Sequence, residues 1–310
     1  MKRTLINQGG GGFTVYLPKK WVIGSGLSGG DQVEIEERGR SLSVSSGPGT
    51  RRESKITLTP ENRGDLAVLM THLYRRGADS IVIGDADEKD KEEARSIARE
   101  LLLGFDVFDN GPRSVKVVSI SEPGSENHEA IFRRLFLIIK ETIKNLSDQA
   151  KTGLVRDIKA VDALKKDHDR YVLFCKRIVL RGDAGDPVTT WELLTFLMHI
   201  EHCMYYLARF CYDNKVTMTP RVKEGLEMAG KYFELYSDAY SCSDIKKIHK
   251  LNELKSKYQF GWCYKSIAAG RGDESVALSL LREAMRLMQI GSSPMLSGII
   301  EKETERTDLT

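Results

Sequence analysis

The spacing of apolar residues changes along the chain, and each spacing predicts a different kind of element. Near the N-terminus an apolar run, Phe13–Leu17, ends at a proline, and apolar and polar residues alternate again over 32–36. A period of two is typical of a strand with one buried face. We therefore expect a strand, a basic corner that carries Lys19 and Lys20, and a second strand. A further strand over 41–44 would complete a small β-domain.

From residue 55 the pattern alternates between strands and helices. Leu66, Leu69, Met70 and Leu73 share one helical face, and this helix lies between strand-like segments at 55–59 and 80–83. A second amphipathic helix is expected at 88–103, followed by strands at 105–108 and 115–120. Helices that alternate with strands predict a small α/β layer.

After Pro123 the strand pattern stops and helical spacing takes over. The segment 154–180 places Val161, Leu164, His168, Tyr171, Cys175 and Ile178 at intervals of three and four, which is typical of a bundle seam. Helices are expected at 129–146, 154–180 and from Thr189 or Thr190 to about 212, then at 220–240, 244–269 and 273–290. Three helices follow three helices, so we expect a duplicated three-helix bundle.

These patterns predict a multidomain chain. The expected parts are a β-domain at 1–46, a linker at 47–54, an α/β domain at 55–123, bundles at 126–213 and 219–301, and a tail at 302–310. The β-domain is too short to bury a core alone, because two small hairpins leave most of their apolar face in contact with water. We therefore expect it to need a partner.

Positive charge is concentrated at the N-terminus. The chain of 310 residues has a net charge of only +3, whereas residues 1–52 hold eight Lys and Arg against four Asp and Glu. Such an excess suits the phosphate backbone of DNA, and the candidate contacts are Lys2, Arg3, Lys19, Lys20, Arg38 and Arg40. A solvated basic edge that prevents strand-to-strand aggregation would have the same charge. Charge alone therefore does not decide between the two interpretations.

Composition and segment lengths limit the class of protein. The chain is 41% hydrophobic and 29% charged, which is typical of a soluble globular protein. The first twelve residues lack the apolar core of a signal peptide, and no run approaches the roughly 18 apolar residues of a membrane helix. The five cysteines include no C-x-x-C pair, so reduced and mostly buried thiols are expected. We expect a cytoplasmic protein without membrane insertion.

The N-terminal motif resembles a known family. Leu17–Trp21, followed by Gly30–Val33, is similar to the motifs of the AbrB/SpoVT family of swapped-hairpin DNA-binding domains. The resemblance covers about the first 46 residues. It implies that two chains interleave their hairpins into one small β-barrel and form a homodimer. It also implies that basic residues on one face of the barrel contact double-stranded DNA.

A second resemblance covers most of the remaining chain. Gly77–Ile83, Arg99–Phe105, Asp167–Tyr171 and Ile200–His202 occur in the order seen in the archaeal-type PhoU family of phosphate uptake regulators. Some members of that family carry an AbrB-like domain in front of an α/β segment and two bundles. The resemblance implies regulation that responds to phosphate, with a phosphate transporter ATPase or a phosphate sensor as partner.

PhoU bundles typically bind divalent metals through E/D-x-x-x-D pairs, because residues four apart share a helical face. Here the corresponding pairs are Lys165 with Asp169 and Glu201 with Tyr205, so each has lost one carboxylate. The candidate ligands are Asp169, Glu201 and His202. In the second bundle the matching positions are Met285 and Gln289.

Two interpretations of the first pair remain open. Lys165 could supply the positive charge of a metal by pairing with Asp169 or Glu201. Alternatively, His168, His199, Glu201, His202 and Cys203 could form a softer site for Fe or Zn. The helix around His199 and His202 is so apolar that the sequence favours core packing, and the seam position of His168 favours a buried histidine with satisfied hydrogen bonds. Trp191, Tyr205 and Tyr206 are likewise expected in the core.

The pattern contains no catalytic motif, since neither a nucleophile elbow nor a glycine loop with Lys-Ser/Thr is present. We therefore expect no enzyme activity. The favoured hypothesis is a homodimeric transcription regulator of phosphate-responsive genes, whose helical half receives a signal or a partner. The alternative is a PhoU-like adaptor that does not bind DNA and that regulates a phosphate transporter or sensor through protein contacts.

Overall fold

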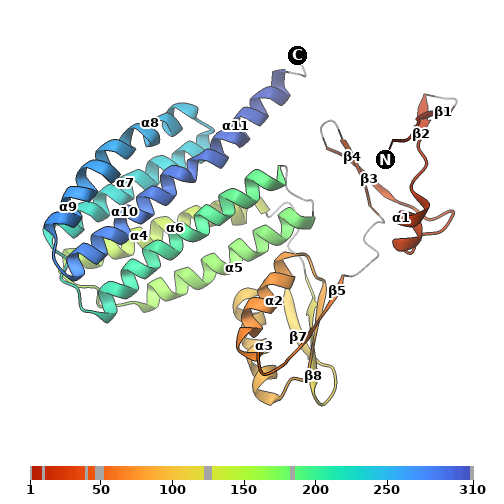
Figure 1. Cartoon of the computed structure of the whole chain (residues 1–310), viewed down its shortest axis with the longest axis horizontal. Coiled ribbons are helices and arrows are strands. Elements are labelled where there is room, and N and C mark those ends of the chain that lie inside the picture. The colour runs from red at the N-terminus through yellow and green to blue at the C-terminus, as the bar shows by residue number, and fades with distance from the viewer. Residues whose placement is uncertain are drawn as a thin grey trace. The chain divides into compact units, whose positions relative to one another are not determined.

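The computed structural model describes residues 2–8, 11–38, 41–45, 52–121, 128–181 and 186–307. The chain divides into two compact units, Met1–Arg52 and Glu53–Thr310. The first unit contains short strands and one short helix, and the second contains a small α/β part and a long helical part (Figure 1). The division falls inside the linker expected at 47–54.

The N-terminal unit contains two separate two-stranded sheets. Strand β1 (Ile6–Gln8) pairs antiparallel with β2 (Gly12–Thr14), and β3 (Glu34–Arg38) pairs antiparallel with β4 (Ser41–Ser45). The expected strands are present but shifted, because β2 ends at Thr14 and β3 begins at Glu34. Strand β1 was not expected, since three residues are too few to display a period.

The basic corner is a helix and not a turn. Helix α1 (Lys19–Gly24) begins with the two lysines. Pro18 precedes it with φ −62°, and its carbonyl oxygen accepts hydrogen bonds from the N–H groups of Trp21 and Val22 at 2.9 and 3.1 Å. Pro18 itself is extended, with ψ 123°, and because it precedes the first turn its missing N–H costs no helical hydrogen bond. The expectation of a simple corner here was wrong for that reason.

The α/β part has a four-stranded sheet in the order β5-β6-β8-β7. Strands β5 (Glu53–Thr57) and β6 (Ser80–Gly84) are parallel, whereas β7 (Phe105–Asp109) and β8 (Ser114–Ser119) pair as an antiparallel hairpin. Helices α2 (Leu66–Arg75) and α3 (Glu88–Leu101) cover one face of the sheet, and a 3-10 turn, η1 (Arg63–Asp65), precedes α2 (Figure 1). The expected order of helices and strands is confirmed.

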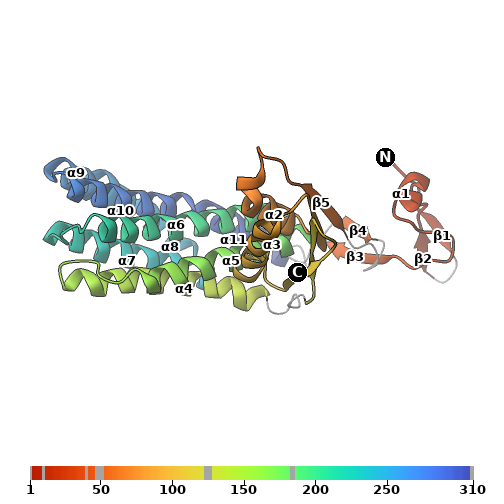
Figure 2. The ribbon, with the colours of Figure 1, turned by 90° about the horizontal axis from the view of Figure 1, so that it is seen from below.

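The helical part begins with three long helices, α4 (His128–Lys151), α5 (Lys159–Arg181) and α6 (Pro187–Asp213). They are followed by α7 (Pro220–Cys242), α8 (Ile245–Lys255), α9 (Tyr264–Ala269), α10 (Asp273–Ile290) and α11 (Ser292–Thr307). In Figure 2 the long helices run alongside one another. Helix α11 continues beyond the expected end of the bundle at 301, through a Glu- and Lys-containing segment of high helix propensity.

One helix start and one helix interior differ from the expectation. Asp186, not Thr189 or Thr190, caps α6, because its carboxylate accepts hydrogen bonds from the N–H groups of Val188 and Thr189. The helix expected at 244–269 is interrupted by a π-helical segment, Ser256–Cys263. The cap depends on a single carboxylate, which hydrophobic spacing does not display.

One continuous apolar core runs through the helical part, from Phe132 to Ile299. Helix α4 contacts α7 and α6 contacts α10, so the two helix triplets share this core. Four of the five cysteines are buried in the bundle, and only Cys242 is exposed, which confirms the expected burial. Within the described residues, no helix is long and apolar enough to cross a membrane.

A buried arginine joins the α/β part to the helices. The guanidinium of Arg177, on α5, donates to the carbonyl oxygens of Tyr74 and Ala78 at 3.0 and 2.6 Å and pairs with Asp79 at 3.2 Å. Its Cζ atom lies 5.0 Å from the ring centroid of Phe105. Because a buried cation needs several such partners, Arg177 fixes α2 and the start of β6 against α5.

Candidate functional site

Four of the six expected DNA contacts have described side chains, and all four are exposed: Lys2, Arg3, Lys19 and Lys20. None of them forms an ion pair with another residue that the structure describes. Arg38 is the last residue of β3, and Arg40 lies outside the described residues.

Lys19 and Lys20 occupy the first turn of α1, which contains no acidic residue. Cations in a first turn oppose the helix dipole at a cost of about 0.3–1 kcal/mol each. The stability of α1 therefore does not explain why two lysines begin this helix. Contact with an external anion would explain it.

The N-terminal unit also exposes its large apolar side chains. Phe13, Tyr16, Ile23, Ile35 and Leu42 are 68, 69, 64, 64 and 68% exposed. None of the residues whose burial is described in this unit is buried. Single exposed apolar residues are ordinary, but a unit that lacks any buried residue gains little hydrophobic stabilisation from its own fold.

A second group of chemically active side chains lies inside the bundle, on α4, α5 and α6. We call Thr142, Lys165, His168, Asp169, Glu201 and His202 the polar cluster. Thr142, His168 and Glu201 are buried, and the other three are half-buried. Both carboxylate oxygens of Asp169 are used, because Lys165 Nζ lies 2.6 Å from Oδ2 and His202 Nε2 lies 2.6 Å from Oδ1. Burial alone would raise the pKa of Asp169, but the hydrogen bonds with His202 and Lys165 hold it below the ordinary value.

Glu201 is fully buried and only half satisfied. Thr142 Oγ1 donates to Glu201 Oε1 at 2.8 Å, while Oε2 has no hydrogen-bond partner among the described residues. Burial raises the pKa of Glu201 to about 8, and the hydrogen bond from Thr142 opposes the shift only in part. The carboxyl group is therefore protonated at neutral pH.

His168 is fully buried as well, and neither of its ring nitrogens has a partner among the described residues. Burial lowers the pKa of His168 to about 3, so its ring is neutral at physiological pH. The expected burial of His168 is confirmed. The expectation that its ring would be hydrogen-bonded was wrong, since no described residue is a partner of either ring nitrogen.

The donor set of this cluster does not fit a metal ion. The ammonium of Lys165 already neutralises Asp169, which is the pairing that the first interpretation of the sequence anticipated. Cys203 Sγ donates to the carbonyl oxygen of Leu280 at 3.2 Å, and His199 is exposed. Within the described residues, no group of three or more His, Cys, Asp and Glu side chains is arranged to hold a metal.

The three aromatic residues expected in the core have different environments. Tyr206 is 54% exposed, so its assignment to the core was wrong, while Trp191 and Tyr205 are partly buried against the bundle core. Helix α6 is apolar on most of its circumference, so spacing does not identify its one solvent-facing side.

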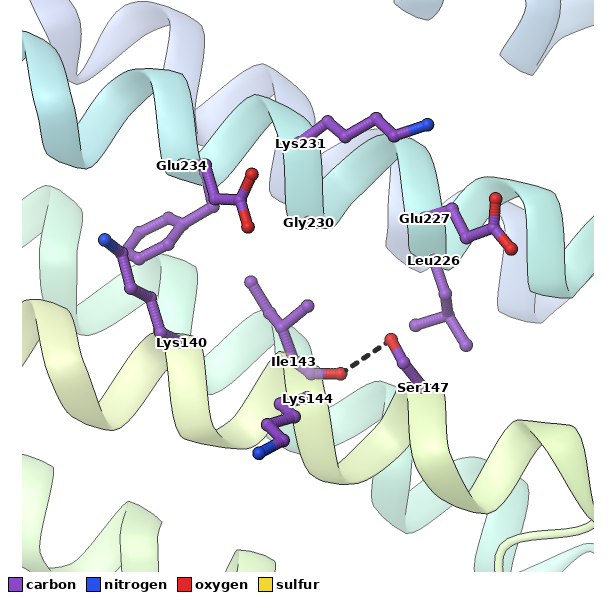
Figure 3. Close-up of a pocket in the computed structure, with 10 residues that line it drawn as sticks. Lys140, Ile143, Lys144, Ser147, Leu226, Glu227, Gly230, Lys231 and Glu234 are labelled. Atoms are coloured by element: carbon purple, nitrogen blue, oxygen red, sulfur yellow. Dashed lines mark hydrogen bonds between the residues drawn. The ribbon is translucent and has the colours of Figure 1, made fainter.

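A groove of 460 Å³ lies between α4 and α7 (Figure 3). Its charged residues are Lys140, Lys144, Glu227, Lys231 and Glu234, and its floor is formed by apolar residues such as Ile143. None of these charged side chains forms an ion pair with a described residue. Charges of both signs alternate around the rim, so the groove selects no particular ligand charge.

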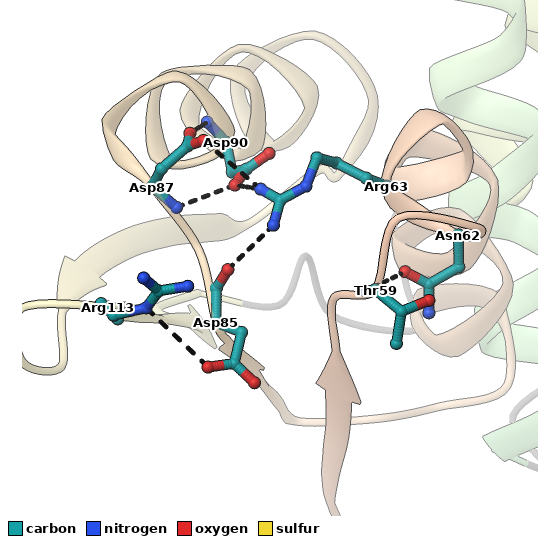
Figure 4. Close-up of polar contacts among 7 residues, drawn as sticks. All are labelled: Thr59, Asn62, Arg63, Asp85, Asp87, Asp90 and Arg113. Atoms are coloured by element: carbon teal, nitrogen blue, oxygen red, sulfur yellow. Dashed lines mark hydrogen bonds and ion pairs between the residues drawn. The ribbon is translucent and has the colours of Figure 1, made fainter.

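The carboxyl ends of β5 and β6 are the usual place for a ligand in an α/β sheet. Here the acidic side chains at that edge are already neutralised (Figure 4). Asp87 caps α3 by accepting from Asp90 N at 2.9 Å, and Arg63 bonds Asp90 and the carbonyl oxygen of Asp85. Arg113 lies 3.8 Å from Asp85. These contacts stabilise the edge, and each of the three aspartates drawn in Figure 4 already has a partner.

Sequence analysis missed two sets of buried polar residues on α5 and its neighbours. Arg177 and Lys176 are buried, at 1 and 3% exposed, and Thr142 is the partner of Glu201. A signal was present, because two adjacent cations interrupt the otherwise apolar segment 172–180.

Comparison of the chain with family models, curated proteins and solved structures finds no match. The resemblances to the AbrB/SpoVT and PhoU families therefore remain predictions, carried by their motifs alone.

Proposed function

We propose that the protein is a homodimeric DNA-binding transcription regulator. In this proposal the N-terminal units of two chains interleave, bury their apolar side chains against one another, and present Lys2, Arg3, Lys19 and Lys20 to the phosphates of double-stranded DNA. The observation that carries it is the combination found in residues 2–45, where large apolar side chains and unpaired cations are exposed together.

The exposed apolar side chains support a second copy of the chain as the partner. They are distributed over β2, α1, β3 and β4, so no single groove collects them. The two small sheets also have free edges within the single chain, to which strands of another chain can add. An interleaved pair would cover both features at once.

The PhoU resemblance extends the proposal to the helical part. In that extension the regulated genes respond to phosphate, and the bundle receives the signal or binds a transporter component or sensor. The shared apolar core makes the bundle a rigid body, which suits a part that transmits the presence of a partner.

The test is the salt dependence of DNA binding by the full chain. We expect the logarithm of the affinity for a mixed-sequence duplex to fall linearly with the logarithm of the salt concentration. In a dimer the double variant Lys19→Glu/Lys20→Glu removes four lysines, two from each chain. It should bind at least about tenfold more weakly and make the slope shallower by about 3.6, since each lost phosphate contact removes about 0.9.

The matched control is Lys89→Glu/Lys246→Glu. Both lysines are exposed on helices of the second unit, and neither pairs with a described residue. The control should bind DNA as the parent protein does. Identical affinity and slope for the Lys19/Lys20 variant and the parent would contradict the proposal and favour the adaptor that does not bind DNA.

A further inference from the structure

Lys176 is a buried lysine that has no counter-ion among the residues that the structure describes. It lies on α5 with 3% of its surface exposed. Its ammonium donates to Thr195 Oγ1 at 2.9 Å, and Nζ lies 4.8 Å from the ring centroid of Trp191, one turn earlier on α6. An ammonium has three donors, so at most one is used by a hydrogen bond that the structure describes.

Arg75 approaches the same aromatic ring from the end of α2. Its Cζ atom lies 6.0 Å from the centroid of Trp191, and its Nη2 atom lies 2.9 Å from the ring nitrogens of His72. Neither Arg75 nor Lys176 contacts a carboxylate of the described residues. Arg75 and Lys176 therefore both lie near the Trp191 ring, and no described carboxylate contacts either of them.

Three further basic side chains lie around this pair. We call His72 and Arg75 on α2, Arg76 at the end of α2, Lys176 on α5, and His199 on α6 the cationic junction. Burial and the charge of Arg75 lower the pKa of Lys176 to about 8. Burial lowers the pKa of His72, helped by the charges of Arg75 and Arg76, and it lowers that of His199, helped by His202 and Lys176. Every cause is burial or another basic side chain.

Arg177, the next residue along α5, is by contrast a buried cation whose hydrogen bonds are formed. Arg177 bonds two carbonyl oxygens and Asp79, and Asp79 Oδ1 also pairs with Arg181 at 2.6 Å. The carboxylate nearest in sequence to the end of α2 is thus already shared by two arginines. It leaves Lys176 and Arg75 without an acidic partner from their own surroundings.

We propose that the cationic junction binds a small doubly charged oxyanion of the phosphate or phosphate-monoester class, held directly by Lys176 and Arg75. Thr195 and Trp191 orient the ammonium, and Arg76 and His199, both exposed, form the rim through which the anion enters. A dianion suits the site because at least two cations converge there. A small ligand suits it because Lys176 is almost entirely enclosed.

The cost of burying an unpaired ammonium gives the physical reason. A buried charge without a partner is destabilising, and the Trp191 ring compensates for only part of that cost. A bound oxyanion would use the free donors of Lys176 and separate it electrostatically from Arg75. This proposal does not depend on DNA binding.

The test is titration of the full-length protein with inorganic phosphate and, separately, with a simple phosphate monoester at constant ionic strength, followed by calorimetry and tryptophan fluorescence. We expect one saturable site per chain and a fluorescence change that Trp191→Phe abolishes. Tighter binding of the monoester would identify a phosphorylated small molecule as the ligand, and equal or tighter binding of phosphate would identify the free ion.

Lys176→Met should weaken the binding about tenfold or more, which is the usual loss when one charge-assisted hydrogen bond is removed. The control is Lys166→Met on the same helix, because Lys166 is exposed and pairs with Glu100 at 3.1 Å. Lys166→Met should bind within about twofold of the parent. In phosphate-free buffer Lys176→Met should melt no lower than the parent, since it loses an unpaired buried charge.

Sulfate adds a pH readout, because its charge is constant between pH 6 and 10. Its affinity should fall by up to about tenfold per pH unit above pH 8, where Lys176 loses its proton, and Lys176→Met should abolish that fall. The Lys19→Glu/Lys20→Glu variant should bind phosphate normally, which separates this site from the proposed DNA surface. Absence of saturable binding by both phosphate probes, or equal weakening by the Lys176 and Lys166 variants, would overturn the proposal.

Discussion

The two units of the chain achieve opposite degrees of burial. The second unit has a continuous helical core and a separate α/β core, and it tolerates several buried polar groups within them. The first unit has no buried residue among those whose burial is described, although it is rich in aromatic and aliphatic side chains. The difference shows that the first unit buries little apolar surface as a single chain, and this is the basis of our proposal that a partner completes it.

Of the variants considered, Phe13→Asp should have the largest effect, because it should destabilise the first unit and leave the second unchanged. Phe13 is 68% exposed in the single chain, so only a partner surface can make a charge there costly. We expect residues 2–45 to lose nearly all hydrogen-exchange protection, by about hundredfold or more, while residues 53–307 keep theirs. Val188→Asp is the control, because Val188 is 75% exposed on the second unit and should leave protection unchanged everywhere. Unchanged protection of 2–45 in Phe13→Asp would show that this unit is stable without burying Phe13.

Arg177→Met tests the second unit's internal connection. The substitution removes one of the ion pairs of Asp79 and the hydrogen bonds to two buried carbonyl oxygens, so it should lower the free energy of unfolding by about 3–5 kcal/mol in urea titrations. Arg133→Met removes an exposed pair with Glu129 and should cost less than about 1 kcal/mol. Similar losses for the two variants would mean that Arg177 does not join the α/β part to α5.

Glu201→Gln should change the pH dependence of stability. The folded-state pKa of about 8 exceeds the ordinary value of 4.5, so the folded state holds an additional proton between these values. Stability should therefore fall as pH rises through this window, with a contribution of at most about 1.4 kcal/mol per pH unit. Glu201→Gln stays neutral and should remove that contribution. Parallel curves for parent and variant between pH 5 and 8 would show that Glu201 is ionised or solvated.

His168→Leu is expected to have the smallest effect and the opposite sign. Neither ring nitrogen of His168 has a described partner, so an apolar side chain of similar size should stabilise the fold by about 1 kcal/mol at pH 7. The gain should grow as pH falls below 6.5, because the ordinary pKa of histidine lies there and the folded protein resists protonation. A destabilised variant in thermal unfolding would instead indicate that a polar group or water satisfies the ring.

Hydrophobic spacing predicted most of the second unit, because each helix and strand there buries one face in a core. It failed at Lys19–Gly24, where Pro18 starts a helix that buries nothing in the single chain. It also could not show which cations on α5 have partners, because Arg177 and Lys176 are adjacent in sequence yet meet different elements. The half-satisfied state of Glu201 depends on Thr142, which lies on another helix 59 residues earlier in the sequence. Periodicity within one helix does not contain that information.

Light scattering of the full-length protein at micromolar concentration tests most directly whether the N-terminal unit is completed by a second copy. We expect a mass of twice the 34.9 kDa chain for the parent and for Val188→Asp, and a single-chain mass for Phe13→Asp. A parent protein that scatters as a single chain, or a Phe13→Asp variant that keeps the doubled mass, would contradict pairing through this unit.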